Sequence, residues 1–261
     1  MQIRMEGRSA LITGGSRGLG RAMALKFAQA GANVAILARR ADVLSETKAE
    51  IEAAAPGAKV MARPCDVSDA GQVEESYRAV AKDFGQVDIL VNNAGTSVRG
   101  RFEELTDEDW QSDFDLKLFA AIRFCRLAFP GMKQRRWGRV INVLNTAAKA
   151  PPAEGAPTAV SRAAGMALTK VLSKEGAPYN VLVNALCTGR FVTDQWLGHH
   201  RNQAPEKTFE EYMRDMGKTI PLGRVGDAEE FASVACFLAS DAGSYVTGVA
   251  INVDGGASPV V

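Results

Sequence analysis

Short apolar runs rich in valine and isoleucine recur along the chain, and more polar segments separate them. The runs occupy residues 9–13, 33–37, 59–62, 87–92, 139–144, 181–186 and 249–253. Most of them lack the alternation of apolar and polar positions that a strand with one solvated face shows. Strands covered by helices on both faces have this continuous apolar character. The pattern therefore predicts about seven buried strands of a parallel sheet.

Longer stretches with helical spacing, such as residues 20–31 and 228–240, lie between these runs. Two helix starts are marked locally, because Thr106 with Asp109 resembles a capping box and Asp227 with Glu230 has the same arrangement. Strand and helix alternate along almost the whole chain. We therefore expect an α/β fold with a doubly wound parallel sheet and helices on both faces.

The length fits one domain over residues 1–261, since 261 residues can form a single α/β core. No Pro/Gly/Ser-rich linker, repeat or low-complexity tract interrupts the pattern. The one irregular stretch, residues 187–219, is polar and follows a late strand. Ligands of open α/β sheets bind beyond the carboxyl ends of the strands, so this stretch is a candidate substrate lid.

Composition excludes several kinds of protein. Lys and Arg number 31 against 30 Asp and Glu, and a net charge of +1 favours neither nucleic acid nor an anionic membrane as a partner. Without a membrane-length apolar run or a signal core, we expect a cytoplasmic protein. Four widely spaced cysteines fit buried thiols in a reducing compartment. The only histidines, His199 and His200, are adjacent and do not suggest a metal site.

A glycine-rich turn follows the first predicted strand and precedes a helix. Glycines in such a turn let the backbone approach a pyrophosphate, which the amides and dipole at the helix start then hold. Taken alone, this motif is weak support for a phosphate site, because ordinary strand-to-helix turns also use glycine. Its candidate phosphate-binding residues are Gly14, Ser16, Arg17, Gly18, Leu19 and Gly20.

Further motifs follow the later strands. Asp66 and Val67 follow the third strand, and Asn93, Ala94 and Gly95 follow the fourth. Together with the glycine turn, the segments 221–232 (PLGRVGDAEEFA) and 253–256 (VDGG) resemble the short-chain dehydrogenase/reductase family. The resemblance covers nearly the whole chain and implies a Rossmann fold with a nicotinamide cofactor along these strand ends. It also implies cofactor contacts from Gly189 and Thr193, although Cys187 and Thr188 precede that glycine where the family usually has proline.

The end of the second strand indicates which cofactor is used. Members of this family that use NAD usually carry an acidic residue there for the ribose hydroxyls, and this chain has Ala38. Arg39 and Arg40 follow, and Arg17 lies in the glycine turn. Guanidinium groups pair with a 2′-phosphate, which a carboxylate would repel, so NADP(H) is expected. The alternative is that these are solvated surface arginines.

The resemblance also implies a set of catalytic positions. The family uses an asparagine, a serine, a tyrosine and a lysine, and the tyrosine exchanges the proton while hydride passes between nicotinamide and substrate. These four positions fall without a gap on Lys117, Asn145, Thr158 and Arg162. All four residue types have changed, and Arg162 is the residue left to hold the nicotinamide ribose.

The substitutions weigh against the usual proton chemistry. The hydroxyl of Thr158 ionises far above the pKa of about 10 of tyrosine, and Arg162 stays protonated. Lys117 is a possible replacement acid, because its pKa falls readily on burial. Lys149 is another candidate, and for both lysines a solvated or paired structural charge is the alternative. Tyr212, in the candidate lid, is the one tyrosine with a plausible route into the site.

Two hypotheses follow. The first is an NADP(H)-dependent oxidoreductase with a non-standard proton path, acting on a small carbonyl or alcohol that the sequence does not identify. The second is a protein of the same fold that binds the cofactor as a sensor or partner subunit without hydride transfer. The family resemblance also implies a homotetramer or dimer through helices near 107–133 and 157–178.

Overall fold

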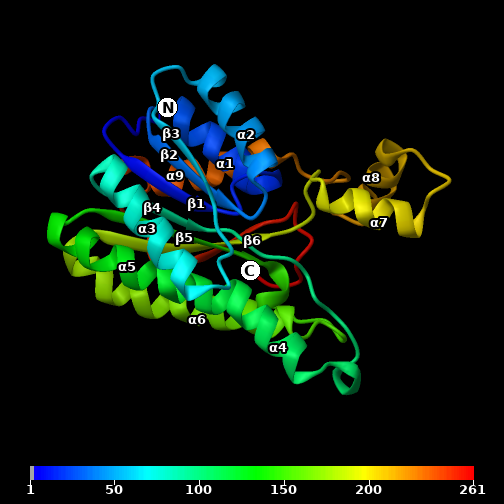
Figure 1. The fold of residues 1–261 in the computed structure, drawn as a ribbon. Helices are drawn as coiled ribbons and strands as arrows, with labels where there is room; N and C mark the ends of the chain where they lie inside the picture. The colour runs from blue at the N-terminus through cyan, green and yellow to red at the C-terminus, as the bar shows by residue number, and fades with distance from the viewer. Residues whose placement is uncertain (1–2) are drawn as a thin grey trace.

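The computed structural model describes residues 3–261, and its centre is a seven-stranded parallel sheet (Figure 1). The strand order is β3-β2-β1-β4-β5-β6-β7, and every neighbouring pair is parallel. All seven apolar runs of the sequence form strands, so the predicted doubly wound sheet is confirmed. The strands are β1 (Ser9–Thr13), β2 (Asn33–Ala38), β3 (Val60–Pro64), β4 (Ile89–Asn92), β5 (Gly138–Asn145), β6 (Val181–Thr188) and β7 (Ala250–Val253).

Helices cover both faces of the sheet, as Figure 1 shows. One face carries α1 (Gly18–Gln29), α2 (Ala41–Ala54) and α9 (Ala228–Ala239). The other carries α3 (Ala70–Phe84), α5 (Ala120–Arg135) and α6 (Thr158–Gly176), with α4 (Asp107–Phe114) leading into α5. Each face has its own apolar core, with Phe27 and Phe231 fully buried in one and Phe124 in the other.

Two of the helix starts were predicted correctly. Thr106 Oγ1 accepts a hydrogen bond from the Asp109 amide at 3.3 Å, and the Asp109 carboxylate accepts one from the Thr106 amide at 3.0 Å. Glu230 likewise accepts a hydrogen bond from the Asp227 amide at 2.9 Å. The reciprocal contacts at Thr106 and the single side-chain contact at Asp227 satisfy amides that the start of a helix leaves without partners.

The stretch 187–219 is more regular than its sequence suggested. It contains the end of β6 and two short helices, α7 (Gln195–Gln203) and α8 (Phe209–Gly217), which project from the body of the molecule in Figure 1. A capping box between Thr208 and Glu211 starts α8. The helices enclose a small separate core around Met213, Ile220 and Val225. The prediction of an irregular loop was wrong because this short amphipathic pattern lies within a polar segment.

The four cysteines are all free and buried, as their apolar surroundings predicted. Burial raises the pKa of the Cys125 thiol to about 12 and that of Cys236 to about 11, so these thiols stay protonated at neutral pH. Within residues 3–261, no helix is long and apolar enough to span a membrane.

Candidate active site

A cleft of about 1000 Å³ opens at the carboxyl ends of the central strands. The chain leaves β1 toward β2 on one side and returns through β4 on the other, and ligands of doubly wound sheets bind at this change of direction. The cleft brings together most of the residues predicted from sequence. Its lining includes Gly14, Arg17, Gly18, Leu19, Asn93, Ala94, Gly95, Asn145, Thr158, Arg162, Gly189 and Thr193.

The glycine turn has the geometry that its sequence predicted. Gly14 and Gly18 have φ values of +63° and +52°, in the left-handed region that side chains disfavour. A Cβ on Gly20 would lie 2.1 Å from the carbonyl oxygen of Gly14, so the helix can start this close to the turn only with glycine there. The backbone is therefore available for close approach by a ligand.

The start of α1 is suited to an anion. Its N-cap residue, Arg17, makes no side-chain capping hydrogen bond, and the first turn contains no acidic residue. The first amides of a helix need external acceptors, and the helix dipole adds positive potential at this end. A pyrophosphate can accept hydrogen bonds from these amides, because no side chain of α1 already occupies them.

The ends of β1 and β4 are fastened together by Thr13 and Asn93. Thr13 Oγ1 accepts hydrogen bonds from the Asn93 and Ala94 amides at 2.9 and 3.0 Å. The Asn93 side chain donates to the carbonyl oxygens of Thr13 and Gly14 at 3.0 and 3.1 Å. Asn93 thus holds the glycine turn against β4 and fixes the floor of the cleft.

The residues predicted to read the adenosine part of the cofactor lie beyond the cleft lining, after β2 and β3. Ala38 pairs with Pro64 in the sheet, which brings Arg39 and Arg40 close to Asp66 and Val67. Arg40 forms an ion pair with Asp42 at 2.6 Å. Arg39 is exposed and has no polar partner among the described residues, so its guanidinium is available to a phosphate.

Two more predicted positions, Ser16 and Gly20, also lie outside the lining. The Ser16 carbonyl oxygen accepts a hydrogen bond from the Thr47 hydroxyl at 2.8 Å. Gly20 packs against the carbonyl group of Gly14 on the helix side of the turn. Val67 is buried, and the Asp66 carboxylate accepts a hydrogen bond from the Ser68 amide at 2.9 Å. In this structure these four residues shape the backbone around the cleft.

The segment before α7 contacts the glycine turn. Thr193 Cγ2 lies 3.3 Å from the position a Cβ of Gly18 would take, and Arg17 Nε lies 3.7 Å from Asp194 Oδ2. Trp196 and His199, whose ring centroids are 5.1 Å apart, also line the cleft. Of the two short helices, α7 therefore borders the cleft, and whether this stretch acts as a lid stays a prediction.

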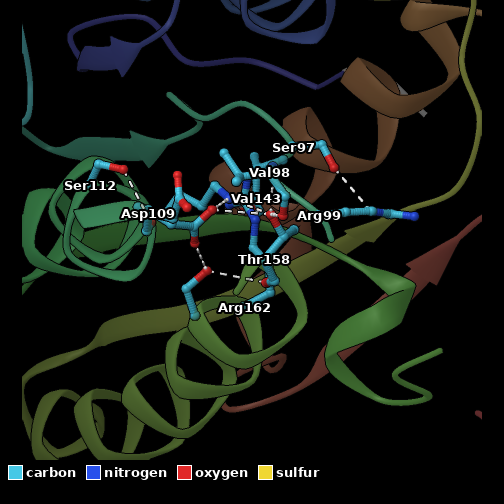
Figure 2. Close-up of polar contacts among 11 residues, drawn as sticks. Ser97, Val98, Arg99, Asp109, Ser112, Val143, Thr158 and Arg162 are labelled. Carbon is cyan, nitrogen blue, oxygen red and sulfur yellow. Dashed lines mark hydrogen bonds and ion pairs between the residues drawn. The ribbon is translucent and has the colours of Figure 1, made fainter. Parts of the chain in front are cut away.

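Thr158 stands at the other end of the cleft, where its hydroxyl is surrounded by protein groups. Figure 2 shows it at the start of α6, facing Val98. The hydroxyl accepts hydrogen bonds from Lys117 Nζ at 2.8 Å and from the Val98 amide at 3.0 Å. It donates to the Val98 carbonyl oxygen at 2.8 Å, and the Asp113 carboxylate lies 3.1 Å away. The hydroxyl thus anchors the loop after β4 to α6.

Lys117 forms a buried ion pair with Asp113 behind Thr158. Their side chains are 1% and 0% exposed, and Ser161 donates to the same carboxylate at 2.6 Å. Lys117 sits in a π-helical segment, Asp115–Phe119, and such segments often mark functional sites. Burial lowers the pKa of Lys117 to about 8; the Asp113 hydrogen bond opposes this shift, and the nearby charge of Arg162 adds to it.

Arg162 and Asn145 face the cleft with unused hydrogen-bonding capacity. Arg162 Nη1 donates to the Val143 carbonyl oxygen at 2.6 Å, while its Nε has no partner among the described residues. Burial lowers the pKa of Arg162 to about 10, so the guanidinium remains charged at neutral pH. Asn145 lies at the end of β5, and its Oδ1 also lacks a described partner. Arg162 can donate to a ligand oxygen, and Asn145 can donate from its side-chain nitrogen or accept at Oδ1 from a ligand hydroxyl.

Sequence reasoning missed Asp113, Ser161 and Thr13. Asp113 lies four residues before Lys117, a spacing that places both on one face of a helix and signals an ion pair. No spacing in the sequence marks Ser161 or Thr13 as a site residue, because a single hydroxyl residue in an apolar segment is common. Their roles depend on contacts between segments far apart in the sequence.

Three other residues considered from sequence are engaged away from the reacting end. Lys149 Nζ donates to the Ala250 carbonyl oxygen at 2.6 Å. Tyr212 Oη, on α8, donates to Gln203 of α7 at 2.9 Å. His200 Nε2 lies 2.7 Å from the Lys207 carbonyl oxygen, whereas its neighbour His199 borders the cleft. Among the described residues, no three His, Cys, Asp or Glu side chains are grouped as a metal site requires.

The geometry has a counterpart in a known family. A family model described as enoyl-(acyl carrier protein) reductase matches residues 14–258, from the glycine turn to the wall of the cleft. The chain belongs to the short-chain dehydrogenase/reductase family. The resemblance deduced from the glycine turn and the later motifs is thereby confirmed.

Relatives match over nearly their full length. D-beta-hydroxybutyrate dehydrogenase of Cupriavidus necator is 34% identical, covering 97% of this chain and 98% of the relative. The NADPH-dependent reductase BacG of Bacillus subtilis is 33% identical with the same coverage of both chains. A crystal structure of L-sorbose reductase from Gluconobacter frateurii, in complex with NADPH and L-sorbose, has a TM-score of 0.95 at 32% identity and covers 100% of both chains.

Proposed function

We propose that this protein is an NADP(H)-dependent oxidoreductase that transfers hydride between the nicotinamide and a small carbonyl compound or alcohol. The observation that carries the proposal is the continuous cleft from the glycine turn to Asn145 and Arg162. It joins a phosphate-binding end to a polar end within one lining. The names of the NADPH-dependent relatives BacG and L-sorbose reductase support the same cofactor.

The residues present fit this cofactor. The amides of the glycine turn and of α1 would hold the pyrophosphate. Arg39 would bind the 2′-phosphate, a role that an acidic residue in place of Ala38 would oppose. Gly95 lines the cleft and has no room for a side chain, because a Cβ there would lie 2.5 Å from Arg162 Nη2; its backbone would border the nicotinamide. When bound, the cofactor supplies or accepts the hydride.

Asn145 and Arg162 would hold the substrate oxygen. Hydride addition turns a carbonyl oxygen into an alkoxide, and a guanidinium aimed at that oxygen stabilises the growing negative charge. Arg162 Nη2 and the side-chain amide nitrogen of Asn145 have no partner among the described residues, and both would donate hydrogen bonds to this oxygen. Both groups are fixed by the ends of β5 and α6 before substrate binds.

Lys117 would supply the proton through Thr158. The Thr158 hydroxyl gives its proton to the alkoxide and takes one from Lys117 Nζ, 2.8 Å away, leaving a neutral amine that solvent reprotonates. A pKa of about 8 suits this exchange, because a general acid works best with a pKa near the working pH. The hydroxyl must exchange its bond to Val98 for one to substrate, at a cost of about 1 kcal/mol.

This path differs from the one that the family resemblance implies. By the spacing that the resemblance implies, the positions of the asparagine, serine, tyrosine and lysine hold Lys117, Asn145, Thr158 and Arg162, so we propose an atypical active site. The second candidate is a cofactor-binding protein without hydride transfer. It is favoured by the burial of Thr158, which is 1% exposed and whose hydroxyl is already bonded to protein groups.

A single-turnover experiment separates the two candidates. Protein loaded with NADPH is mixed with a broad panel of carbonyl compounds, and the loss of reduced-nicotinamide absorbance is followed. The matched variant is Thr158→Tyr/Arg162→Lys. Oxidation of NADPH by the native protein supports the oxidoreductase. Oxidation only by the variant shows an intact cofactor site without native proton chemistry and favours the binding protein.

We also propose a homodimer or homotetramer formed through the helices near 107–133 and 157–178. Apolar side chains on this side are partly exposed, including Phe119 at 40% and Val171 at 54%. Exposed apolar surface of this kind is typical of interfaces between subunits. Light scattering on the native protein tests the proposal, and a monomer's mass would refute it.

A further inference from the structure

Positive charge is in excess at the reacting end of the cleft. Lys117 and Arg162 lie there together, and the charge of Arg99 is close enough to lower the pKa of Lys117 further. Arg99 reaches this position because its segment pairs with Pro157 in an isolated β-bridge just before α6. Asp113 is the one described carboxylate that contacts this group. Three positive charges therefore lie near a single described carboxylate.

Arg99 itself lines the cleft without a carboxylate partner. It is exposed, and its polar contact in the described structure is with Ser97 Oγ, 3.0 Å from Nε. Figure 2 shows its side chain extending away from Thr158, with the guanidinium end beyond Ser97. Arg101, two residues later, differs, since it lies within 4.0 Å of Glu104 and 3.8 Å of Glu154.

A second unpaired guanidinium lines the same cleft. Arg190 Nη1 donates to the Thr219 hydroxyl at 2.7 Å and has no carboxylate partner in the described part of the chain. At the phosphate end, by contrast, Arg17 is balanced by Asp194. Arg99 and Arg190 therefore line the cleft without a described carboxylate to balance them, whereas Arg17 of the glycine turn has one.

We propose that the substrate carries a carboxylate close to its reacting carbonyl, and that Arg99 binds this carboxylate. This inference rests on the proposed function, because it names the substrate class of the same site. Guanidinium groups bind carboxylates with paired, charge-assisted hydrogen bonds, which an ester or amide cannot match. Arg190 lines the same cleft and adds to the positive potential. An oxo acid is the simplest compound with both groups.

The test compares oxo acids with their methyl esters, which keep the reacting carbon and remove the charge. The pairs are pyruvate, acetoacetate and benzoylformate, each beside its ester, in NADPH oxidation assays. We expect kcat/KM for the acids to exceed that for the esters by about tenfold, the worth of one charge-assisted hydrogen bond. Arg99→Gln should remove this preference, and Arg101→Gln should keep it.

A binding measurement distinguishes substrate recognition from cofactor recognition. Calorimetry on the NADP⁺ complex, which cannot reduce the acids, gives the Kd of each acid and ester, and fluorescence gives the Kd of NADPH. Arg99→Gln should weaken the acids about tenfold, by the same hydrogen-bond argument, and leave the NADPH Kd within about twofold. A loss of NADPH affinity instead would assign Arg99 to the cofactor and overturn the inference.

The remaining outcomes separate this inference from the proposed function. Turnover of esters without preference for acids keeps the oxidoreductase and overturns the carboxylate site. Arg99-dependent binding of acids without any NADPH oxidation keeps the carboxylate site and overturns the oxidoreductase. Absence of both binding and turnover across the panel overturns both.

Discussion

Removing the charge of Lys117 separates its structural role from its catalytic one. In Lys117→Met the Asp113 carboxylate stays buried, with Thr158 and Ser161 as its hydrogen-bond donors but no cation in contact. Breaking a buried ion pair from one side costs about 3–5 kcal/mol, because an uncompensated charge is left in a medium of low polarity. This is a large part of the roughly 5–15 kcal/mol that stabilises a typical protein.

The double variant Lys117→Met/Asp113→Leu should recover most of that loss. Both hydroxyls keep another acceptor, since Thr158 can donate to the Val98 carbonyl oxygen at 2.8 Å and Ser161 to the Thr158 carbonyl oxygen at 3.1 Å. Replacement of a buried pair by apolar residues is often neutral or stabilising, so we expect a free energy of unfolding within about 1 kcal/mol of the native protein.

Urea denaturation of the native protein, both single variants and the double variant measures the coupling energy. Lys48→Met is the matched surface control, because Lys48 and Glu52 form an exposed pair with the same spacing at 3.7 Å, and it should cost less than about 1 kcal/mol. A single Lys117→Met variant that also loses less than about 1 kcal/mol would refute the buried-pair reasoning. The folded double variant should lack NADPH oxidation, and full activity there would refute Lys117 as the proton source.

Three further predictions concern pH, the glycine turn and the cofactor. The pKa of Lys117 is lowered from 10.5 to about 8, so the unfolded chain binds more protons than the folded protein between these two pH values. The free energy of unfolding of the native protein should therefore rise with pH across this window. Relative to the Lys117→Met/Asp113→Leu variant, the rise should reach up to about 3 kcal/mol in denaturation experiments at different pH values. Gly20→Ala should lower stability by about 1–3 kcal/mol in urea denaturation and weaken NADPH binding, while Gly57→Ala, with open space around it, should do neither. Arg39→Ala should weaken NADPH binding by about tenfold in fluorescence titrations and leave the affinity for NADH unchanged. Arg40→Ala should have a smaller effect on NADPH binding, because Arg40 is paired with Asp42. Equal losses of affinity for NADPH and NADH in Arg39→Ala would argue against a 2′-phosphate contact.

The sheet and much of the cleft could be predicted from the sequence because their signals are local. Seven apolar runs gave seven strands, and the glycines of the turn after β1 have the positive φ values and close contacts that their spacing suggested. Parallel strands then bring their carboxyl ends to one edge of the sheet, so residues after β1, β4 and β5 meet without any further signal.

The rest depends on contacts between distant segments. The bonds from Thr158 to Lys117 and Val98 join three separate parts of the chain, and no spacing in the sequence encodes them. Arg99 gained significance only when the structure placed it on the cleft wall without a carboxylate partner. The helices α7 and α8, within the predicted lid at 187–219, were missed for a different reason, since their short amphipathic pattern is weak beside the surrounding polar residues.

The most direct test of the proposed hydride transfer follows the hydride itself. Native protein is incubated with the carbonyl panel and NADPH that carries deuterium at the transferable position, and the products are examined by mass spectrometry. The oxidoreductase predicts an alcohol with one deuterium on the former carbonyl carbon. Label retained in NADPH with every native incubation, but transferred by Thr158→Tyr/Arg162→Lys, would contradict it and leave a protein that binds the cofactor without using it.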